Sequence, residues 1–202
     1  MKAISNFLSW TFHPLLIASY ATALYLFRLP SDFGTSPVLL QLIILGMIIT
    51  GTFLLPALST IIMVRIGNIG NLKMERQEER NWPLLLTAMI YFACYYALNM
   101  RQIPGFIQLF LLGAGASMVA GLLVNLKWKL SLHMIGMGGL CGGLSGFFFA
   151  GAASDIMLLA VCFVLAGALG TARLFLQAHS PVQILLGFLI GFTAEFSVMQ
   201  LL

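Results

Sequence analysis

Residues 37–64 read PVLLQLIILGMIITGTFLLPALSTIIMV, an apolar run without one charged side chain. A transmembrane α-helix needs about 20 consecutive apolar residues, and stretches of this kind recur along the whole chain. Only 8% of the 202 residues are charged and 60% are hydrophobic, whereas ordinary soluble domains are roughly 25% charged. A 22.0 kDa soluble protein has no core large enough to hide so much apolar surface. The sequence therefore predicts an all-α, polytopic membrane helix bundle.

Seven apolar segments are expected, separated by short stretches that hold the polar and helix-breaking residues. The segments cover about residues 7–27, 37–64, 83–99, 104–125, 131–152, 155–177 and 180–202. Residues 83–99 are at the short end for a span, so they form either a span or half of a partly submerged hairpin with 104–125. The prediction is six or seven transmembrane helices in a single integral membrane domain over residues 1–202.

The N-terminal segment has the features of a signal peptide, with Lys2, an apolar run and then Ala21, Thr22 and Ala23. Because the apolar run continues past this tripeptide, we expect residues 7–27 to be the first span, retained in the mature protein.

Glycines recur at four-residue spacing in two later segments. The pairs are Gly138/Gly142, Gly139/Gly143, Gly142/Gly146 and Gly187/Gly191. Small residues at this spacing let helix backbones approach closely in lipid, so close helix packing is predicted.

Three polar loops are expected on one side of the membrane, because the segments between them run out and back in pairs. The loops lie at residues 66–82, 126–132 and 173–180, and each leads into an apolar segment. A helix N-terminus in a low-dielectric medium offers free N–H groups and partial positive charge, which favour an anion. The chemistry-bearing residues expected to converge there are Lys73, Arg80 and Arg173 with His133 and His179.

Cations together with two imidazoles are the groups that phosphoryl transfer without a metal requires. One histidine attacks phosphorus, the other protonates the leaving oxygen, and the cations hold the remaining oxygens. No cofactor or metal is therefore expected. The net charge of +4 suits anionic headgroups or phosphate ligands. It is too sparse for a nucleic-acid surface.

The order and spacing of these residues resemble the type-2 phosphatidic acid phosphatase family, whose motifs are Lys-x6-Arg-Pro, Pro-Ser-Gly-His and Ser-Arg-x5-His-x3-Asp. This chain has Lys73 and Arg80 at the first spacing, Ser131 and His133 of the second motif, and Arg173 and His179 at the third spacing. The resemblance covers about residues 66–185. It implies a helical membrane phosphatase that works through a phosphohistidine. By that resemblance His179 is the nucleophile, His133 the general acid, and Lys73, Arg80, Ser131 and Arg173 bind phosphate.

Several positions depart from the family motifs. They are Asn81 for Pro, Leu130 and Leu132 for Pro and Gly, Ala172 for Ser, and Gln183 for Asp. The last departure matters most, because the family's Asp orients the nucleophilic imidazole and stabilises its charge. Losing the analogous carboxylate in serine proteases costs about 10⁴ in rate. Gln183 is still able to accept a hydrogen bond from His179, and Ser180 to Gln183 also match a capping box with proline at the first helical position.

Other interpretations of individual residues remain open at this stage. The charged loop around Arg80 also fits a solvated loop at a membrane surface, and His133 fits an interfacial histidine. His13 fits a packed or interfacial residue. Glu195, deep in the last apolar segment, is either a functional carboxyl or a protonated structural one. Cys94, Cys141 and Cys162 lie inside apolar runs and fit packing residues rather than a disulfide or metal framework.

Together these features predict a membrane phosphatase acting on a lipid phosphate or diphosphate, such as a polyprenyl diphosphate, phosphatidylglycerophosphate or phosphatidate. The alternatives are a non-catalytic lipid-phosphate binder on the same scaffold and a small membrane transporter. The expected location is the bacterial inner (cytoplasmic) membrane. The excess of Lys and Arg around the three loops favours a cytoplasmic active face by the positive-inside rule. The family resemblance favours the outer face instead.

Overall fold

The computed structural model describes residues 1–29, 36–72, 74, 76–99, 103, 105–151 and 155–201. The described chain is helical and contains no strand. Its α-helices are α1 (Lys2–Thr11), α2 (Ile17–Phe27), α3 (Val38–Ile49), α4 (Leu55–Arg65), α5 (Asn81–Asn99), α6 (Gly105–Asn125), α7 (Leu132–Phe149), α8 (Ile156–Phe175) and α9 (Pro181–Met199). Short 3₁₀ turns at Pro14–Leu16 and Glu78–Arg80 precede α2 and α5, and a π-helical turn at Thr50–Leu54 joins α3 to α4. The predicted all-α fold class is confirmed.

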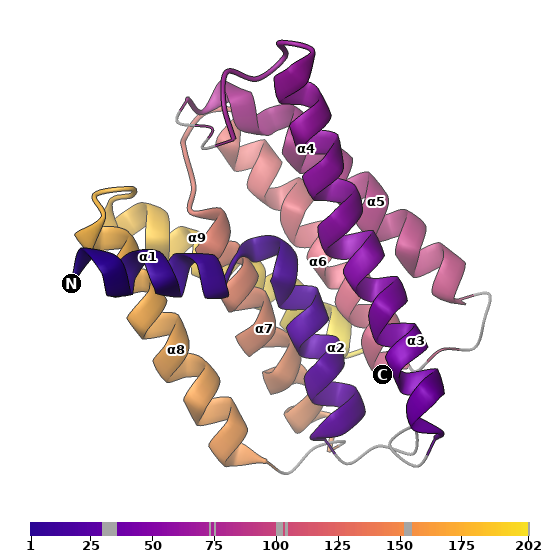
Figure 1. The fold of residues 1–202 in the computed structure, drawn as a ribbon. Helices are drawn as coiled ribbons and strands as arrows, with labels where there is room; N and C mark the ends of the chain where they lie inside the picture. Colours follow the sequence, from indigo (N-terminus) through magenta and orange to yellow (C-terminus); the bar gives the residue numbers. More distant parts are fainter. Residues whose placement is uncertain are drawn as a thin grey trace.

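Six helical segments within the described residues are long and apolar enough to cross a membrane. They are Val38–Arg65, Glu78–Asn99, Gly105–Asn125, Leu132–Phe149, Ile156–Phe175 and Pro181–Met199. Figure 1 shows consecutive segments running in alternating directions, so the loops before α5, α7 and α9 lie at one end of the bundle. We call this end the motif end, because the described residues of the three motifs lie there. The chain is an integral membrane protein, and the predicted placement of the three loops on one side is confirmed.

The first apolar stretch is not the single continuous span expected over residues 7–27. The chain breaks at His13, because a proline restricts the residue before it to extended backbone; His13 has φ −63° and ψ 134°. Helix α1 has 10 residues and α2 has 11. At a rise of about 1.5 Å per residue, each is roughly half as long as the ~30 Å apolar core of a bilayer. Figure 1 shows α1 lying crosswise to α8, while α2 runs down the bundle.

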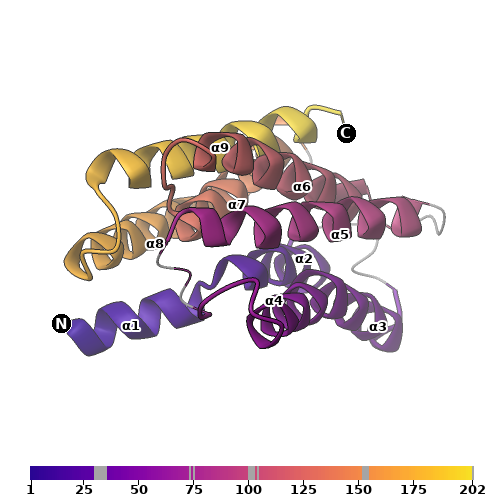
Figure 2. The ribbon, with the colours of Figure 1, turned by 90° about the horizontal axis from the view of Figure 1, so that it is seen from above.

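Helix α7 lies at the centre of the bundle, and every residue from Met134 to Phe147 is buried. Figure 2 shows α6, α7 and α9 side by side. The glycines of α7 and α9 permit this contact: a Cβ at Gly138 would collide with the carbonyl oxygen of Phe188 in α9. A Cβ at Gly187 would lie 2.8 Å from the carbonyl oxygen of Ser131. The close helix packing predicted from the glycine spacing is confirmed.

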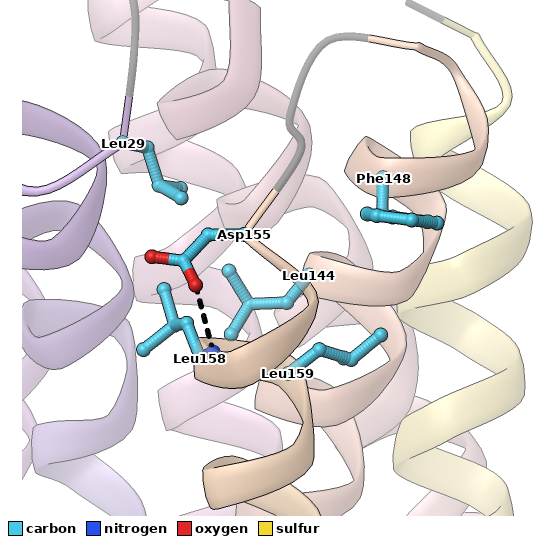
Figure 3. A pocket seen from close by; sticks show the side chains of 6 residues that line it. All are labelled: Leu29, Leu144, Phe148, Asp155, Leu158 and Leu159. Atoms are coloured by element: carbon cyan, nitrogen blue, oxygen red, sulfur yellow. Dashed lines mark hydrogen bonds between the residues drawn. The ribbon is translucent and has the colours of Figure 1, made fainter.

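The end of the bundle opposite the motif end is held by Asp155. One carboxylate oxygen of Asp155 accepts from the backbone N–H of Leu158 at 3.0 Å and so caps α8. The other oxygen lies 2.8 Å from the Arg28 guanidinium. Figure 3 shows Asp155 in a small pocket whose other lining side chains are apolar. The Asp155 carboxylate caps α8 and pairs with Arg28, so this pocket has a structural role. It is separate from the motif end.

Candidate active site

His179 is held at the start of α9 by Gln183, one helical turn later. The Oε1 atom of Gln183 lies 3.2 Å from the Nδ1 atom of His179 and 3.1 Å from the backbone nitrogen of Ser180. A backbone N–H only donates, so the Gln183 atom that receives it is the amide oxygen. His179 must then donate from Nδ1, which leaves the lone pair on Nε2 free. This is the tautomer that a nucleophilic histidine needs.

The capping box predicted for this helix start is present. The Ser180 hydroxyl accepts from the backbone N–H of Gln183 at 3.4 Å, while the Gln183 side chain accepts from Ser180. Capping and orientation of His179 were separate interpretations of Gln183 in the sequence. In the structure the same amide oxygen does both, so the helix cap fixes the histidine tautomer.

The turn between α8 and α9 brings His179 back beside Arg173. Helix α8 ends in a Schellman motif, in which Ala178 N–H donates to the Arg173 carbonyl at 3.2 Å and Gln177 N–H donates to the Leu174 carbonyl at 2.8 Å. Gln177 takes the left-handed conformation with φ 51°. The tight reversal explains why two motif residues six positions apart share one end of the bundle.

Arg80 joins the first motif loop to the start of α7. Its Nε donates to the carbonyl of Met74 at 3.0 Å, and its Nη1 donates to the carbonyl of Leu130 at 3.0 Å. The side chain is buried. The interpretation of Arg80 as part of a solvated charged loop is therefore wrong for this residue. The neighbouring Arg76 and Glu78, by contrast, form an exposed ion pair and fit that interpretation.

Ser131 stands immediately before α7 and is fully buried. Its hydroxyl has no hydrogen-bond partner among the described residues, and it does not cap the helix. Buried hydroxyls are nearly always paired. The first N–H groups of a helix also lack partners within the helix and carry partial positive charge. An unpaired hydroxyl beside a helix start suits the oxygen of an anion.

Arg173 and His133 meet at a residue that the sequence interpretation left out. Arg173 Nη1 donates to the Ser9 hydroxyl at 3.1 Å, and His133 Nε2 lies 3.0 Å from the Ser9 carbonyl oxygen. Because a carbonyl only accepts, His133 carries its proton on Nε2. The Nε of Arg173 is buried and has no partner among the described residues. Ser9 thus holds one group from α7 and one from α8.

His13 also belongs to this end of the bundle. Its ring packs edge-on against the ring of His133, with centroids 5.8 Å apart. Its Nδ1 accepts from the backbone N–H of Leu15 at 3.4 Å, which caps the short 3₁₀ turn. The sequence offered one signal for this neighbourhood: Ser5 and Ser9 are four residues apart in a largely apolar stretch and so share a helix face.

The charges of this cluster interact. Burial lowers the pKa of His179 from its usual 6.5 to about 4; the charge of Arg80 contributes, the bond to Gln183 opposes, and Arg173 and Lys129 lower it further. Arg80 and Arg173 are close enough to repel each other, and His133 interacts electrostatically with Arg173 and His179. His179 is therefore a neutral imidazole at pH 7, beside two cations.

The structure brings together the predicted site residues Arg80, Ser131, His133, Arg173, His179 and Gln183. Lys73, the remaining predicted phosphate ligand, lies outside the described residues. Among those that are described, no group of three or more His, Cys, Asp or Glu side chains is arranged to hold a metal ion.

Glu195 lies in α9, far along the helix from His179. It is fully buried against Gly113 and Gly139, and its Oε2 has no partner among the described residues. The absence of side chains at the two glycines makes the room that the carboxyl fills. Glu195 is therefore a buried group of the helix packing and does not belong to the cluster at the motif end.

Comparison of the chain with protein-family models, curated proteins and solved structures gives no match. The family resemblance thus rests on the order and spacing of the motif residues.

Proposed function

We propose that the protein is a metal-independent phosphatase that hydrolyses a lipid phosphate or diphosphate through a phosphohistidine at His179. The observation that carries the proposal is the state of this imidazole. It is neutral at pH 7, its Nδ1 proton is held by Gln183, and its Nε2 lone pair is free beside Arg80 and Arg173. A histidine prepared in this way is a nucleophile for phosphorus.

The reaction takes two steps. His133 takes up a second proton when the anionic headgroup binds beside it. His179 Nε2 then forms a bond to phosphorus while the bond from phosphorus to the lipid oxygen breaks, and the His133 imidazolium gives its Nε2 proton to that leaving oxygen. Water then attacks phosphorus and gives one proton to His133 Nε2, while the bond from phosphorus to His179 Nε2 breaks. Inorganic phosphate leaves, and both histidines return to their starting forms. The unpaired N–H of Arg173 and the unpaired hydroxyl of Ser131 are available to the phosphate oxygens. Arg80 adds a fixed positive charge that stabilises the negative charge of the transition state.

The substrate class follows from where the cluster lies. The site is at the end of a bundle of apolar spans, so a headgroup bound there leaves its acyl or prenyl tails beside the helices. A polyprenyl diphosphate, phosphatidylglycerophosphate and phosphatidate all meet this requirement. The proposed location is the bacterial inner membrane.

One observation favours a second candidate, a non-catalytic lipid-phosphate binder. Gln183 orients His179 but carries no charge, so it cannot stabilise the imidazolium as the carboxylate of the family does. The binder keeps the cations and the phosphate affinity and lacks turnover.

Phosphate release from detergent-solubilised protein separates the two candidates. Wild-type protein is expected to release phosphate and to carry an acid-labile phosphoryl group when quenched during turnover. His179→Ala should abolish both, while Thr171→Ala, an exposed position on α8, should change neither. Full turnover by His179→Ala would remove His179 as the nucleophile. Phosphate binding without release in wild type would establish the binder.

A further inference from the structure

The N-terminal helix α1 has two faces of different chemistry. Its buried residues are Ser5 and Ser9, whereas Ile4, Phe7 and Trp10 are exposed, Trp10 to 77%. Such a helix is too short to span a bilayer and suits the boundary between headgroups and acyl chains, where tryptophan is enriched. Helix α1 packs on α8, whose outer surface also exposes Leu174 and Phe175. The apolar face of α1 therefore continues the lipid-facing surface of a membrane span.

The buried face of α1 occupies the candidate site. The Ser9 hydroxyl accepts from Arg173 and the Ser9 carbonyl accepts from His133. Two oxygen atoms of Ser9 therefore contact Arg173 and His133, the two side chains that the oxygens of a bound phosphate ester are expected to contact. While Ser9 is there, the proton that His133 would give to a leaving oxygen points at a backbone carbonyl instead. Ser9 thus occupies hydrogen-bonding groups of both Arg173 and His133.

Helix α1 is tied to α2 at its C-terminal end. The helix ends at Thr11, whose carbonyl accepts from the Tyr20 hydroxyl at 2.7 Å, and the ring of Phe12 packs edge-on against that of Tyr20. Beyond this fixed point the backbone is extended at His13. The buried residues of the rest of α1 are serines, and Leu8 is its one partly buried apolar side chain that packs against the core. Segments of this kind open at low cost in free energy.

We propose that α1 is a lid that lies in the membrane interface and closes the site through Ser9 until a lipid phosphate displaces it. The proposal rests on the proposed function in taking Arg173 and His133 as the groups that receive phosphate. The exchange is favourable because it replaces each bond that Ser9 makes. It also supplies an acceptor for the unpaired Arg173 Nε–H and places an anion on a cation.

Binding of inorganic phosphate to full-length protein in detergent tests the lid. Ser9→Ala removes the hydroxyl that competes for Arg173, so phosphate should bind about tenfold tighter, the equivalent of one hydrogen bond to a charged group. Ser5→Ala, one turn earlier on the same buried face, is the matched control and should bind phosphate as wild type does. Equal or weaker binding by Ser9→Ala, or no measurable binding by either protein, would overturn the proposal.

Fluorescence of Trp10 tests the same idea without changing Ser9. In a Trp82→Phe, Trp128→Phe variant, Trp10 is the one remaining tryptophan. In phosphatidylcholine vesicles, bromines placed near the headgroup end of the acyl chains should quench it more than bromines placed deeper, and inorganic phosphate should change that quenching. Stronger quenching by the deeper bromines, or quenching that inorganic phosphate does not change, would contradict the lid. Phosphate release by the wild-type protein is measured separately. If Ser9→Ala binds phosphate more tightly but wild type releases none, the lid stands and the phosphatase proposal fails. If wild type releases phosphate but Ser9→Ala binds it with unchanged affinity, the lid alone fails.

Discussion

Replacing Gln183 with glutamate adds the carboxylate that the site lacks and keeps the length of the side chain. One glutamate oxygen then accepts from both Ser180 N–H and His179 Nδ1–H, as the amide oxygen does now at 3.1 and 3.2 Å. A unit charge at about 4 Å contributes about 4 kcal/mol at an effective dielectric constant of 20. Desolvation of the carboxylate offsets part of this energy. We expect the pKa of His179 to rise by about 2 units from its present value of about 4.

The rise has opposite effects at the two ends of the pH range. Only neutral His179 attacks phosphorus. The acid limb of the pH–rate profile should therefore shift to higher pH, and the variant should be slower than wild type near pH 5. Above pH 7 both proteins have a neutral imidazole, and the carboxylate stabilises the positive charge that develops on it. A stabilisation of about 2.7 kcal/mol, equivalent to 2 pKa units, corresponds to about 100-fold faster formation of the phosphoenzyme.

Two measurements decide this prediction. Nitrogen-15 NMR of labelled histidine gives the pKa and the tautomer of His179, and rapid quench gives the rate of phosphoenzyme formation. Gln183→Met, of similar length but with no acceptor oxygen, is the control and should lose the Nδ1–H tautomer. Gln183→Asp is one methylene shorter and should lose the capping box. A glutamate variant with the pKa of His179 still near 4, or with a raised pKa and no gain above pH 7, would refute the reasoning.

Four further predictions follow from the same geometry. His133→Ala should slow an alkyl phosphate much more than an aryl phosphate, since only the poor leaving group needs a proton; equal slowing would assign His133 to binding. Because burial lowers the pKa of His179, the unfolded chain binds more protons between pH 6.5 and 4, so acidification through this window should cost wild type about 3 kcal/mol more stability than it costs His179→Gln, measured by thermal unfolding in detergent. Gln177 has a left-handed backbone, which costs a non-glycine residue about 1 kcal/mol, so Gln177→Gly should raise the unfolding temperature; no rise would show that the turn is not strained. A cysteine at the exposed Arg76 in a cysteine-free background should react with an impermeant thiol reagent in intact spheroplasts if the motif end faces outward; protection until lysis would place it in the cytoplasm.

Much of the bundle follows from the sequence because lipid imposes simple rules on it. Spans are long apolar runs, and alternating direction sets which loops share an end. The same parity brought Arg80, His133 and His179 to one end without any knowledge of contacts. The glycine spacing predicted close helix packing for a similarly local reason, since a missing Cβ is what permits the approach, and the structure shows that α7 and α9 pack against each other.

The N-terminal part of the site was out of reach because apolarity alone does not separate a helix that crosses a membrane from one that lies along it. The run from Phe7 to Phe27 was long enough for a span, but Pro14 holds His13 in an extended conformation and so divides the run into two short helices. The role of Ser9 depends on its backbone carbonyl as well as its hydroxyl, and a carbonyl has no sequence signature. The double use of Gln183 was equally hidden, because spacing fits a helix cap and a histidine partner alike.

The close contact of α7 and α9 also governs which sequence changes the protein tolerates. Both helices begin at the site, α7 beside Ser131 and His133 and α9 beside His179, and Gly187 lies where they touch. A methyl group added at Gly187 pushes against the Ser131 carbonyl and so separates the two helix starts together with their histidines. In a mutational scan scored by turnover, this glycine would be as intolerant as a catalytic residue. It would carry that signature without touching a reacting atom.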